Sequence, residues 1–381
     1  METGAGKSRW RFAIVIGVLV LMSRLAFISK PYFVDGPAHV RAVTSGANFI
    51  QPPGYFLFNK TAWLLVHALS ISSAAALMSL NIAFSIAGAI IFALLVTRSF
   101  PGPLGMLLAV FYAFSDVAWF VAEVHSSYAS VTFFAPLLLY VVWFMESGWI
   151  VGVVWGVMAG FRPSDGVFVL PFIAWMLIRK PKQIPFFLAT AVPIFTLWYF
   201  PTVQHFGGGI LSPLHAAAGQ VERQANGIFA SDSPLRKIGN LVHVGTAAFD
   251  GWNLLAVAML LGMFACEKRS KDLVVYMLPG LLFYILYFFS DPSYFSFLLA
   301  PGVILAGYGL SRFRPATAYA ITAIAITISI VQMALLRPIG YKNEAEATLD
   351  AYVLEYSGWG LRHEYFLLLH EAVADMHQRR Q

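Results

Sequence analysis

The stretch "YFVDGPAHVRAVTSGANFIQPPGYF", residues 32–56, directly follows a long apolar run and brings charge to the end of that run. It carries Asp35, His39 and Arg41, and it ends in a Pro-Pro-Gly turn at residues 52–54. Ionisable groups at membrane depth are costly and usually mark a functional site. The stretch therefore predicts a polar loop, stiffened by prolines, just beyond a first membrane span.

The composition of the whole chain supports a membrane protein. Of its 381 residues, 59% are hydrophobic and 12% are charged, whereas soluble domains carry charge on about 25% of their residues. This predicts an all-α, polytopic transmembrane helix bundle. The net charge of +6 comes from small groups of Lys and Arg between apolar runs, which is typical of membrane topology, so we do not expect nucleic acid as a partner. The single Cys266 excludes an intrachain disulfide.

The apolar runs predict about eleven membrane spans, within a range of 9–13. The first run is too long for a signal peptide and lacks a clear cleavage site, so we interpret it as an uncleaved span. The fifth and sixth runs are short and could form a broken hairpin that does not fully cross. The expected spans are 10–29, 73–97, 103–121, 130–146, 149–161, 166–178, 185–203, 252–266, 273–290, 294–311 and 316–336.

Basic clusters orient the predicted bundle. With eleven spans, all five clusters fall on one face, which the positive-inside rule makes cytoplasmic together with the N-terminus. The clusters are Lys7/Arg9/Arg11, Arg98, Arg179/Lys180/Lys182, Lys268/Arg269/Lys271 and Arg312/Arg314.

The opposite, noncytoplasmic face receives the longer loops. The first outer loop is expected at 30–72 and a second long one at 204–251. We divide the chain into a transmembrane domain, 1–336, and a small helical noncytoplasmic tail, 337–381. A bundle with plain connectors on one side and structured polar loops on the other has its working surface on the second side.

The tail contains three histidines at intervals of seven. This spacing places them on one face of a helix. Metal ligands on a helix usually lie four residues apart, so a solvated face is the simpler interpretation of His363, His370 and His377.

Asp35 has two interpretations. If "DGPAHVRAV" is helical, Asp35 and His39 are neighbours on one face, and Asp35 could act as a general base that His39 supports or orients. Alternatively, Asp35 could cap a helix that has Pro37 in its first turn. The spacing alone does not separate the two roles.

The third expected span carries acidic groups and ends in polar ones. Asp116 and Glu123 are seven apart and share a face. We interpret Asp116 as part of a hydrogen-bonded patch between helices. At the outer mouth, Glu123, His125 and Tyr128 could recognise sugar hydroxyls, or Glu123 could serve as a second acid or base.

Arg162, in "GVMAGFRPSDGVFVLP", is the strongest candidate cation. Pro163 ends the helix behind it, and an Arg facing a bundle interior needs an anion. That anion could be Asp165, three residues on, or a phosphate. Asp291, by contrast, begins "DPSYF" and favours a helix cap.

These residues together resemble the GT-C superfamily of polytopic glycosyltransferases, in particular its mannosyltransferase and aminoarabinose-transferase-like branch. The resemblance lies in an acidic residue early in the first outer loop, Asp35, and in "QPP" at 51–53, where members have "HPP" and Gln51 replaces the His. It continues in "GFRPSDGVFVLPF" at 160–172, where Arg162 occupies the basic position. It covers roughly residues 10–180.

The resemblance implies a sugar donor linked to polyprenyl phosphate, transfer on the noncytoplasmic side and inversion at the anomeric carbon. Asp35 would be the catalytic base. The donor and substrate contacts would come from His39, Arg41, Glu123, His125, Tyr128, Arg162 and Asp165. The first loop has no Asp-x-Asp pair, so neither a divalent metal nor another cofactor is expected. The expected partners are the donor, a glycan, lipid or protein acceptor, and the bilayer, in a bacterial inner membrane.

A multi-span transporter or lipid flippase is the alternative function. Asp116 and Arg162 could line its pathway, but transporters usually contain internal repeats, and the sequence shows none. A noncatalytic scaffold would fit the tail and leave Asp35 unexplained.

Overall fold

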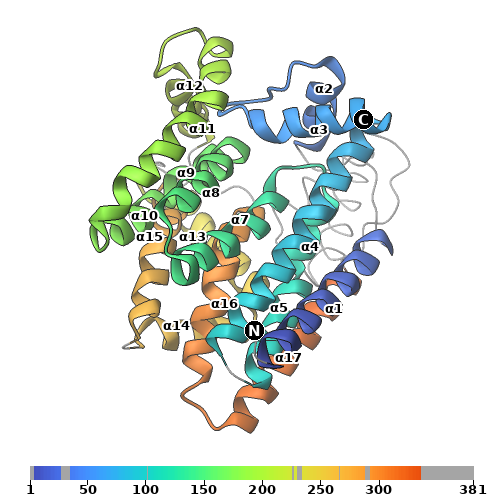
Figure 1. The fold of residues 1–381 in the computed structure, drawn as a ribbon, viewed down its shortest axis with the longest axis vertical. Helices are drawn as coiled ribbons and strands as arrows, with labels where there is room; N and C mark the ends of the chain where they lie inside the picture. Colours follow the sequence, from blue (N-terminus) through green and yellow to red (C-terminus); the bar gives the residue numbers. More distant parts are fainter. Residues whose placement is uncertain are drawn as a thin grey trace.

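The computed structural model describes residues 4–26, 35–100, 102–224, 227–229, 234–265, 267–287 and 292–335. Within these ranges the chain is helical and contains no strand. The expected all-α fold is therefore confirmed (Figure 1). The predicted tail with its three histidines, and Asp291, lie outside the described residues.

The helices follow one another with short connections. Two helices form the first outer loop and two more form the loop expected at 204–251, so both loops are structured. The order is α1 (Gly4–Ala26), α2 (Gly36–Ser45), α3 (Phe56–Leu69), α4 (Ser73–Ser99), α5 (Pro103–Phe114), α6 (Asp116–Glu123), α7 (Tyr128–Tyr140), η1 (Val141–Met145), α8 (Gly148–Phe161), α9 (Pro163–Phe168), α10 (Leu170–Ile178), η2 (Pro181–Gln183), α11 (Ile184–His205), α12 (Ser212–Gln224), α13 (Pro234–Trp252), α14 (Leu255–Met263), α15 (Lys268–Leu286), η3 (Pro292–Phe295), α16 (Ser296–Leu310) and α17 (Pro315–Leu335).

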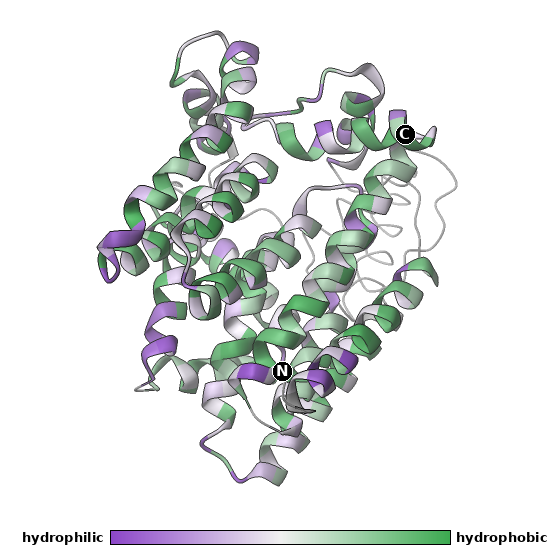
Figure 2. Cartoon of the chain, in the orientation of Figure 1, coloured by the Kyte–Doolittle hydropathy of each residue, from purple (hydrophilic) through white to green (hydrophobic). Residues whose placement is uncertain are grey.

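Among the described residues, six helical stretches are long and apolar enough to cross a membrane. The molecule is an integral membrane protein, and its hydrophobic residues fill the body of the bundle (Figure 2). The stretches are Ser73–Ser99, Pro103–Glu123, Tyr128–Met145, Pro181–His205, Ser293–Leu310 and Pro315–Gln332. The total of eleven crossings stays a prediction.

Some expected spans differ from the helices found. The run 103–121 contains two helices because the chain leaves the α-region at Ser115, whose hydroxyl accepts a hydrogen bond from the Ala118 amide and so starts α6. The runs 149–161 and 166–178 are short apolar helices, Gly148–Phe161 and Pro163–Ile178. The run 252–266 holds α14, whose nine residues extend only about 14 Å.

Helix α4 is the central element of the bundle. It packs against α1, α5 and α7 (Figure 1). Its 27 residues extend about 40 Å, enough to cross the hydrocarbon core and separate two ends of the molecule.

Three of the five basic clusters meet at one end of α4, which we call the basic end. There Arg98 and Arg269 both lie over the Phe144 ring, at 4.1 and 4.8 Å. Ion pairs join Lys180 to Glu146 and Arg179 to Asp272, each at 2.7 Å. Three segments far apart in sequence thus place their cations together, as the positive-inside pattern predicts.

The other end of α4 carries the first outer loop, and we call it the site end. The Thr44 hydroxyl of α2 donates to the Ser73 hydroxyl over 2.8 Å, which fixes α2 at the first turn of α4. The loop and the basic clusters therefore lie at opposite ends of one helix.

Close packing of α14 on α16 depends on glycine. A Cβ at Gly309 would overlap the Ala258 carbonyl oxygen, and one at Gly262 would overlap that of Leu305. Small residues of this kind let membrane helices approach closely. We expect Gly309→Ala to lower stability by about 1–3 kcal/mol through overpacking, measured as a lower Tm in detergent.

The matched control is Gly245→Ala in α13, where an added Cβ meets nothing within 4 Å. This variant should keep or slightly raise the Tm, because Ala favours the helix over Gly. An equal Tm for the two variants would contradict the packing argument.

Candidate active site

The first helix of the outer loop presents Asp35. Helix α2 begins at Gly36 with Pro37 in its first turn, and the His39 amide bonds to the Asp35 carbonyl over 2.9 Å. Asp35 occupies the N-cap position, but its carboxylate makes no capping hydrogen bond. It accepts a hydrogen bond from Gln51 Nε2 instead, over 2.7 Å. Helix capping therefore does not account for this side chain.

The Pro-Pro-Gly turn brings Gln51 to Asp35. Gly54 adopts φ +104°, a conformation open to glycine, and its amide bonds back to the Gln51 carbonyl over 2.9 Å. The turn closes the segment between α2 and α3 and returns the chain to the start of α2. The "QPPG" motif thus supplies both the turn and the hydrogen-bond donor for the carboxylate.

His39 lies one helical turn from Asp35 and is fully buried. Its Nδ1 lies 2.6 Å from Asn59 Oδ1 on α3, and its ring packs edge-on against Phe58 at 5.0 Å. His39 is therefore bonded to α3, and the Asp35 carboxylate takes its hydrogen bond from Gln51.

Arg162 lies at the break between α8 and α9, where the backbone is extended before Pro163. Its Nε donates to Asp165 Oδ2 over 2.7 Å and its Nη1 to the Ser127 hydroxyl over 3.2 Å. The guanidinium lies over the Tyr128 ring, 3.9 Å from its centroid. The Arg162–Asp165 pair is therefore present, and it uses only part of a guanidinium that has five N–H donors.

The turn between α6 and α7 supports the same site. Asn81 of α4 donates from Nδ2 to the carbonyls of Val124 and Ser126, over 2.6 and 2.9 Å. The turn presents His125, which is 2% exposed. A Cβ at Gly36 would lie 3.5 Å from His125 Cβ, so the start of α2 packs directly on this histidine.

The electrostatics place these groups in one cluster. Burial raises the pKa of the Asp35 carboxyl to about 6, although the Arg162 charge and the Gln51 hydrogen bond oppose the rise. Burial also lowers the pKa values of His39 and His125 to about 4. Arg162 and His125 both lower the pKa of His39 further. We call Asp35, His39, His125 and Arg162 the site cluster.

The remaining predicted site residues fall on either side of the site cluster. Tyr128 and Asp165 belong with Arg162. Glu123 ends α6, is buried, and accepts from Trp119 Nε1 over 2.5 Å. It also interacts electrostatically with Arg24 of α1, so these contacts place it toward α1. Asp116 is buried at the start of the same helix.

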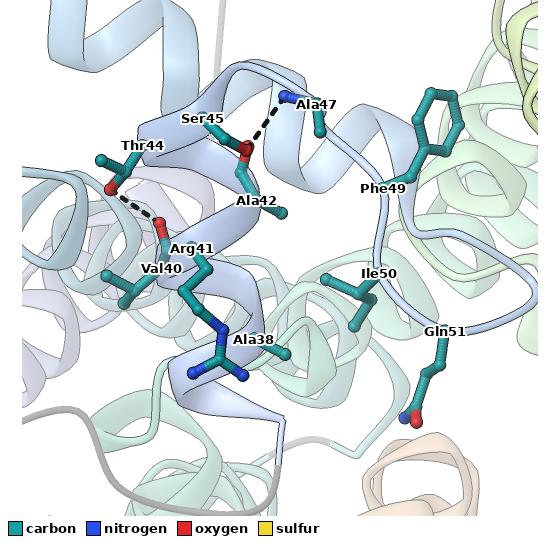
Figure 3. Close-up of a pocket in the computed structure, with 10 residues that line it drawn as sticks. All are labelled: Ala38, Val40, Arg41, Ala42, Thr44, Ser45, Ala47, Phe49, Ile50 and Gln51. Carbon is teal, nitrogen blue, oxygen red and sulfur yellow. Dashed lines mark hydrogen bonds between the residues drawn. The ribbon is translucent and has the colours of Figure 1, made fainter.

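A pocket of about 670 Å³ lies between α2 and the segment that leads to Gln51 (Figure 3). Arg41, on the exposed side of α2, contributes the charged side chain of its lining. Gln51 lines the pocket and bonds to Asp35, and so connects the two. The lining residues are Ala38, Val40, Arg41, Ala42, Thr44, Ser45, Ala47, Phe49, Ile50 and Gln51.

Several contacting residues have no signal in the local sequence. Ser127 and Tyr55 approach Arg162 from other segments, and Asn59 fixes His39. Gln51 had one usable signal, since it replaces the His of the "HPP" motif. Among the described residues, no group of three or more His, Cys, Asp or Glu is placed to hold a metal ion. The absence of a metal cofactor remains a prediction.

The fold is similar to solved structures of membrane glycosyltransferases. ArnT from Cupriavidus metallidurans bound to undecaprenyl phosphate matches with a TM-score of 0.54 and 14% identity, over 100% of this chain and 73% of ArnT. Apo ArnT matches with a TM-score of 0.55 and 14% identity, over 99% and 73%. The arabinofuranosyltransferase AftD from mycobacteria matches with 0.51 and 15%, over 85% of this chain and 27% of AftD.

These neighbours are GT-C glycosyltransferases, and the chain has the GT-C fold. The predicted resemblance is thereby confirmed at the level of the fold. No family model matches the sequence. No curated protein matches it either.

Removing one member of the Arg162–Asp165 pair should destabilise the protein more than removing both. Arg162→Leu leaves a buried carboxylate without its cation, and we expect a loss of about 3–5 kcal/mol. The double variant Arg162→Leu/Asp165→Leu removes both charges and should recover much of that loss. Thermal unfolding of the three proteins in one detergent measures both effects. A double variant less stable than Arg162→Leu would contradict this account.

Proposed function

We propose that the protein is a glycosyltransferase that moves a sugar from a polyprenyl-phosphate donor to an acceptor hydroxyl at the site end, with inversion. One observation carries this proposal. The Asp35 carboxylate and the Arg162 guanidinium interact electrostatically in the site cluster, next to a pocket of about 670 Å³. Ligand sites are commonly of this size and have mostly apolar walls with a few polar groups.

Asp35 is the proposed general base. A general base needs a pKa close to the operating pH and a fixed orientation. Burial supplies the raised pKa of about 6, and the Gln51 hydrogen bond holds the carboxylate. In a direct displacement, Asp35 takes the proton of the acceptor hydroxyl as its oxygen attacks the anomeric carbon. A single displacement of this kind inverts the configuration.

Arg162 is the proposed partner of the leaving phosphate. As the bond between sugar and phosphate breaks, negative charge grows on the phosphate oxygens, and a preorganised cation stabilises it. Hydrogen bonds to Asp165 and Ser127 and packing on the Tyr128 ring hold the guanidinium in place. Arg41 supplies a second positive charge at the pocket, where a headgroup would enter from the lipid.

The comparisons support this reaction over transport. ArnT, with a similar fold, was solved bound to undecaprenyl phosphate. The basic end lies opposite the site cluster along α4, which supports a noncytoplasmic site by the positive-inside rule. A bacterial inner membrane, with the site facing outward and the N-terminus in the cytoplasm, is part of the proposal.

Transfer should require the Asp35 carboxylate. Purified protein is incubated with radiolabelled pentosyl and hexosyl undecaprenyl phosphates and an extract of envelope acceptors. We expect Asp35→Asn to lose about 10²–10⁴-fold in rate, the typical contribution of a general base. Glu146→Gln, an equivalent change at the basic end, is the control and should transfer at the wild-type rate.

Equal transfer by wild type and Asp35→Asn would remove Asp35 from the mechanism. Uptake of a labelled solute into vesicles, with every glycosidic bond intact, would instead indicate a transporter.

The transfer rate should rise with pH through about 6, because only the ionised Asp35 can accept a proton. His39 and His125 belong to the same cluster, but their pKa values of about 4 place their titration below this rising limb of the pH–rate profile. The Gln51 hydrogen bond favours the carboxylate, so its removal raises the Asp35 pKa. We therefore expect Gln51→Leu to move the limb to higher pH, measured as kcat/KM against pH. An unmoved limb would show that another group titrates.

A further inference from the structure

Two buried histidines in the site cluster each leave one ring nitrogen without a partner. These atoms are His39 Nε2 and His125 Nδ1, and neither has a hydrogen bond to any part of the chain that the structure describes. The two side chains are 0% and 2% exposed. Buried polar groups in folded proteins are almost always bonded, so each such atom needs an explanation.

The contacts of His39 fix which of its nitrogens carries the proton. Asn59 uses its amide nitrogen to donate to the Asn48 carbonyl, over 3.2 Å. Its oxygen, Oδ1, must therefore be the acceptor facing His39 Nδ1, and Nδ1 carries the proton. A neutral imidazole has one proton, so Nε2 is an acceptor.

The same reasoning applies to His125. The ring bonds to the backbone of Ala74, at the start of α4. Nδ1 is the unbonded nitrogen, so we infer that Nε2 is the nitrogen directed to the Ala74 carbonyl. Nδ1 is then the acceptor of a neutral ring. The lowered pKa values of both histidines support neutral rings at pH 7.

Both acceptors lie in the site cluster, and two acceptors cannot satisfy each other. His125 influences the titration of His39 directly, and α2 packs on His125 through Gly36. Two lone pairs repel, and the described residues supply no donor to either nitrogen, so we look to a bound O–H group for the donor. Sugars and water offer O–H donors, whereas a phosphate oxygen offers only lone pairs and would be excluded.

We propose that His39 Nε2 and His125 Nδ1 form an acceptor pair that binds a hydroxyl of the donor sugar beside Asp35. This inference rests on the proposed function and adds to it a contact that recognises the sugar. It separates two tasks within the site cluster. Arg162 binds the phosphate, and the two imidazoles bind an uncharged hydroxyl. A sugar lacking that hydroxyl would leave both nitrogens unpaired and should be rejected.

Amide substitutions can separate the acceptor from the structural bond of each ring. An Asn amide overlaps ring Nδ1 and a Gln amide overlaps ring Nε2. His39→Asn and His125→Gln therefore keep the bonds to Asn59 and Ala74 and delete the acceptors. His39→Gln and His125→Asn do the reverse. If the acceptors bind sugar, the first pair should raise the KM of the glycosyl lipid about ten- to a hundredfold, with a near-native Tm. The second pair should lower the Tm more and raise the KM less.

A binding measurement keeps this test independent of transfer. Protein labelled with ¹⁵N-histidine in nanodiscs is titrated with pentosyl or hexosyl undecaprenyl phosphate, and in parallel with undecaprenyl phosphate alone. We expect the glycosyl lipids to shift the two unprotonated ring-nitrogen resonances, and the bare lipid phosphate to leave them unchanged. Shifts without any transfer would support the hydroxyl site while the proposed reaction failed.

Two results would overturn the acceptor pair. In the first, the wild type transfers sugar, but no glycosyl lipid shifts the resonances of the two unprotonated ring nitrogens. This would mean that only water bonds to these nitrogens. The other is an increase in KM confined to His39→Gln and His125→Asn, which would mean that the rings act only through Asn59 and Ala74.

Discussion

The buried charge of Arg162 constrains the arrangement of the site end. A guanidinium removed from water is stable only when its charge and its N–H groups are compensated. Asp165 of α9 does this together with the adjacent Ser127 and Tyr128 at the start of α7, and Tyr55 approaches the same cation from a third segment at 5.8 Å. Moving any of these segments would expose the uncompensated charge. The requirement to bury one arginine therefore positions the α6–α7 turn and the start of α3 relative to α9.

The Arg162 charge also acts on Asp35 of the first loop and helps to set the pKa of its carboxyl. Burial alone would make the carboxyl hard to ionise, while Arg162 and Gln51 favour its charged form. The balance leaves a pKa of about 6, where the group can hold or release a proton near neutral pH. Helix α4 keeps this balance away from the basic end, which lies about one membrane thickness away. There Arg179 and Lys180 are paired with Asp272 and Glu146.

Sequence reasoning predicted features that depend on local spacing. The helix after Asp35, the neighbouring positions of Asp35 and His39, and the pairing of Arg162 with Asp165, one of its two candidate anions, all follow from residues three or four apart. It could not predict that Gln51 bonds to Asp35 or that Ser127 bonds to Arg162, because these pairs are 16 and 35 residues apart. The position of Glu123 beside Trp119 and Arg24 depends on how α6 rotates after the break at Ser115. A hydrophobicity pattern contains no information on that rotation.

The neutral partner of Asp35 explains how one small cluster can hold a base and a cation together. If Arg162 bonded directly to Asp35, it would strongly lower the carboxyl pKa and neutralise the cation. Instead, Arg162 Nε donates a hydrogen bond to Asp165, and Asp35 Oδ1 accepts one from the uncharged amide of Gln51. Each charge thus keeps bonding capacity for a substrate. The glutamine of "QPPG" orients the proposed base without adding a charge, and this leaves Arg162 as the positive group for the proposed phosphate.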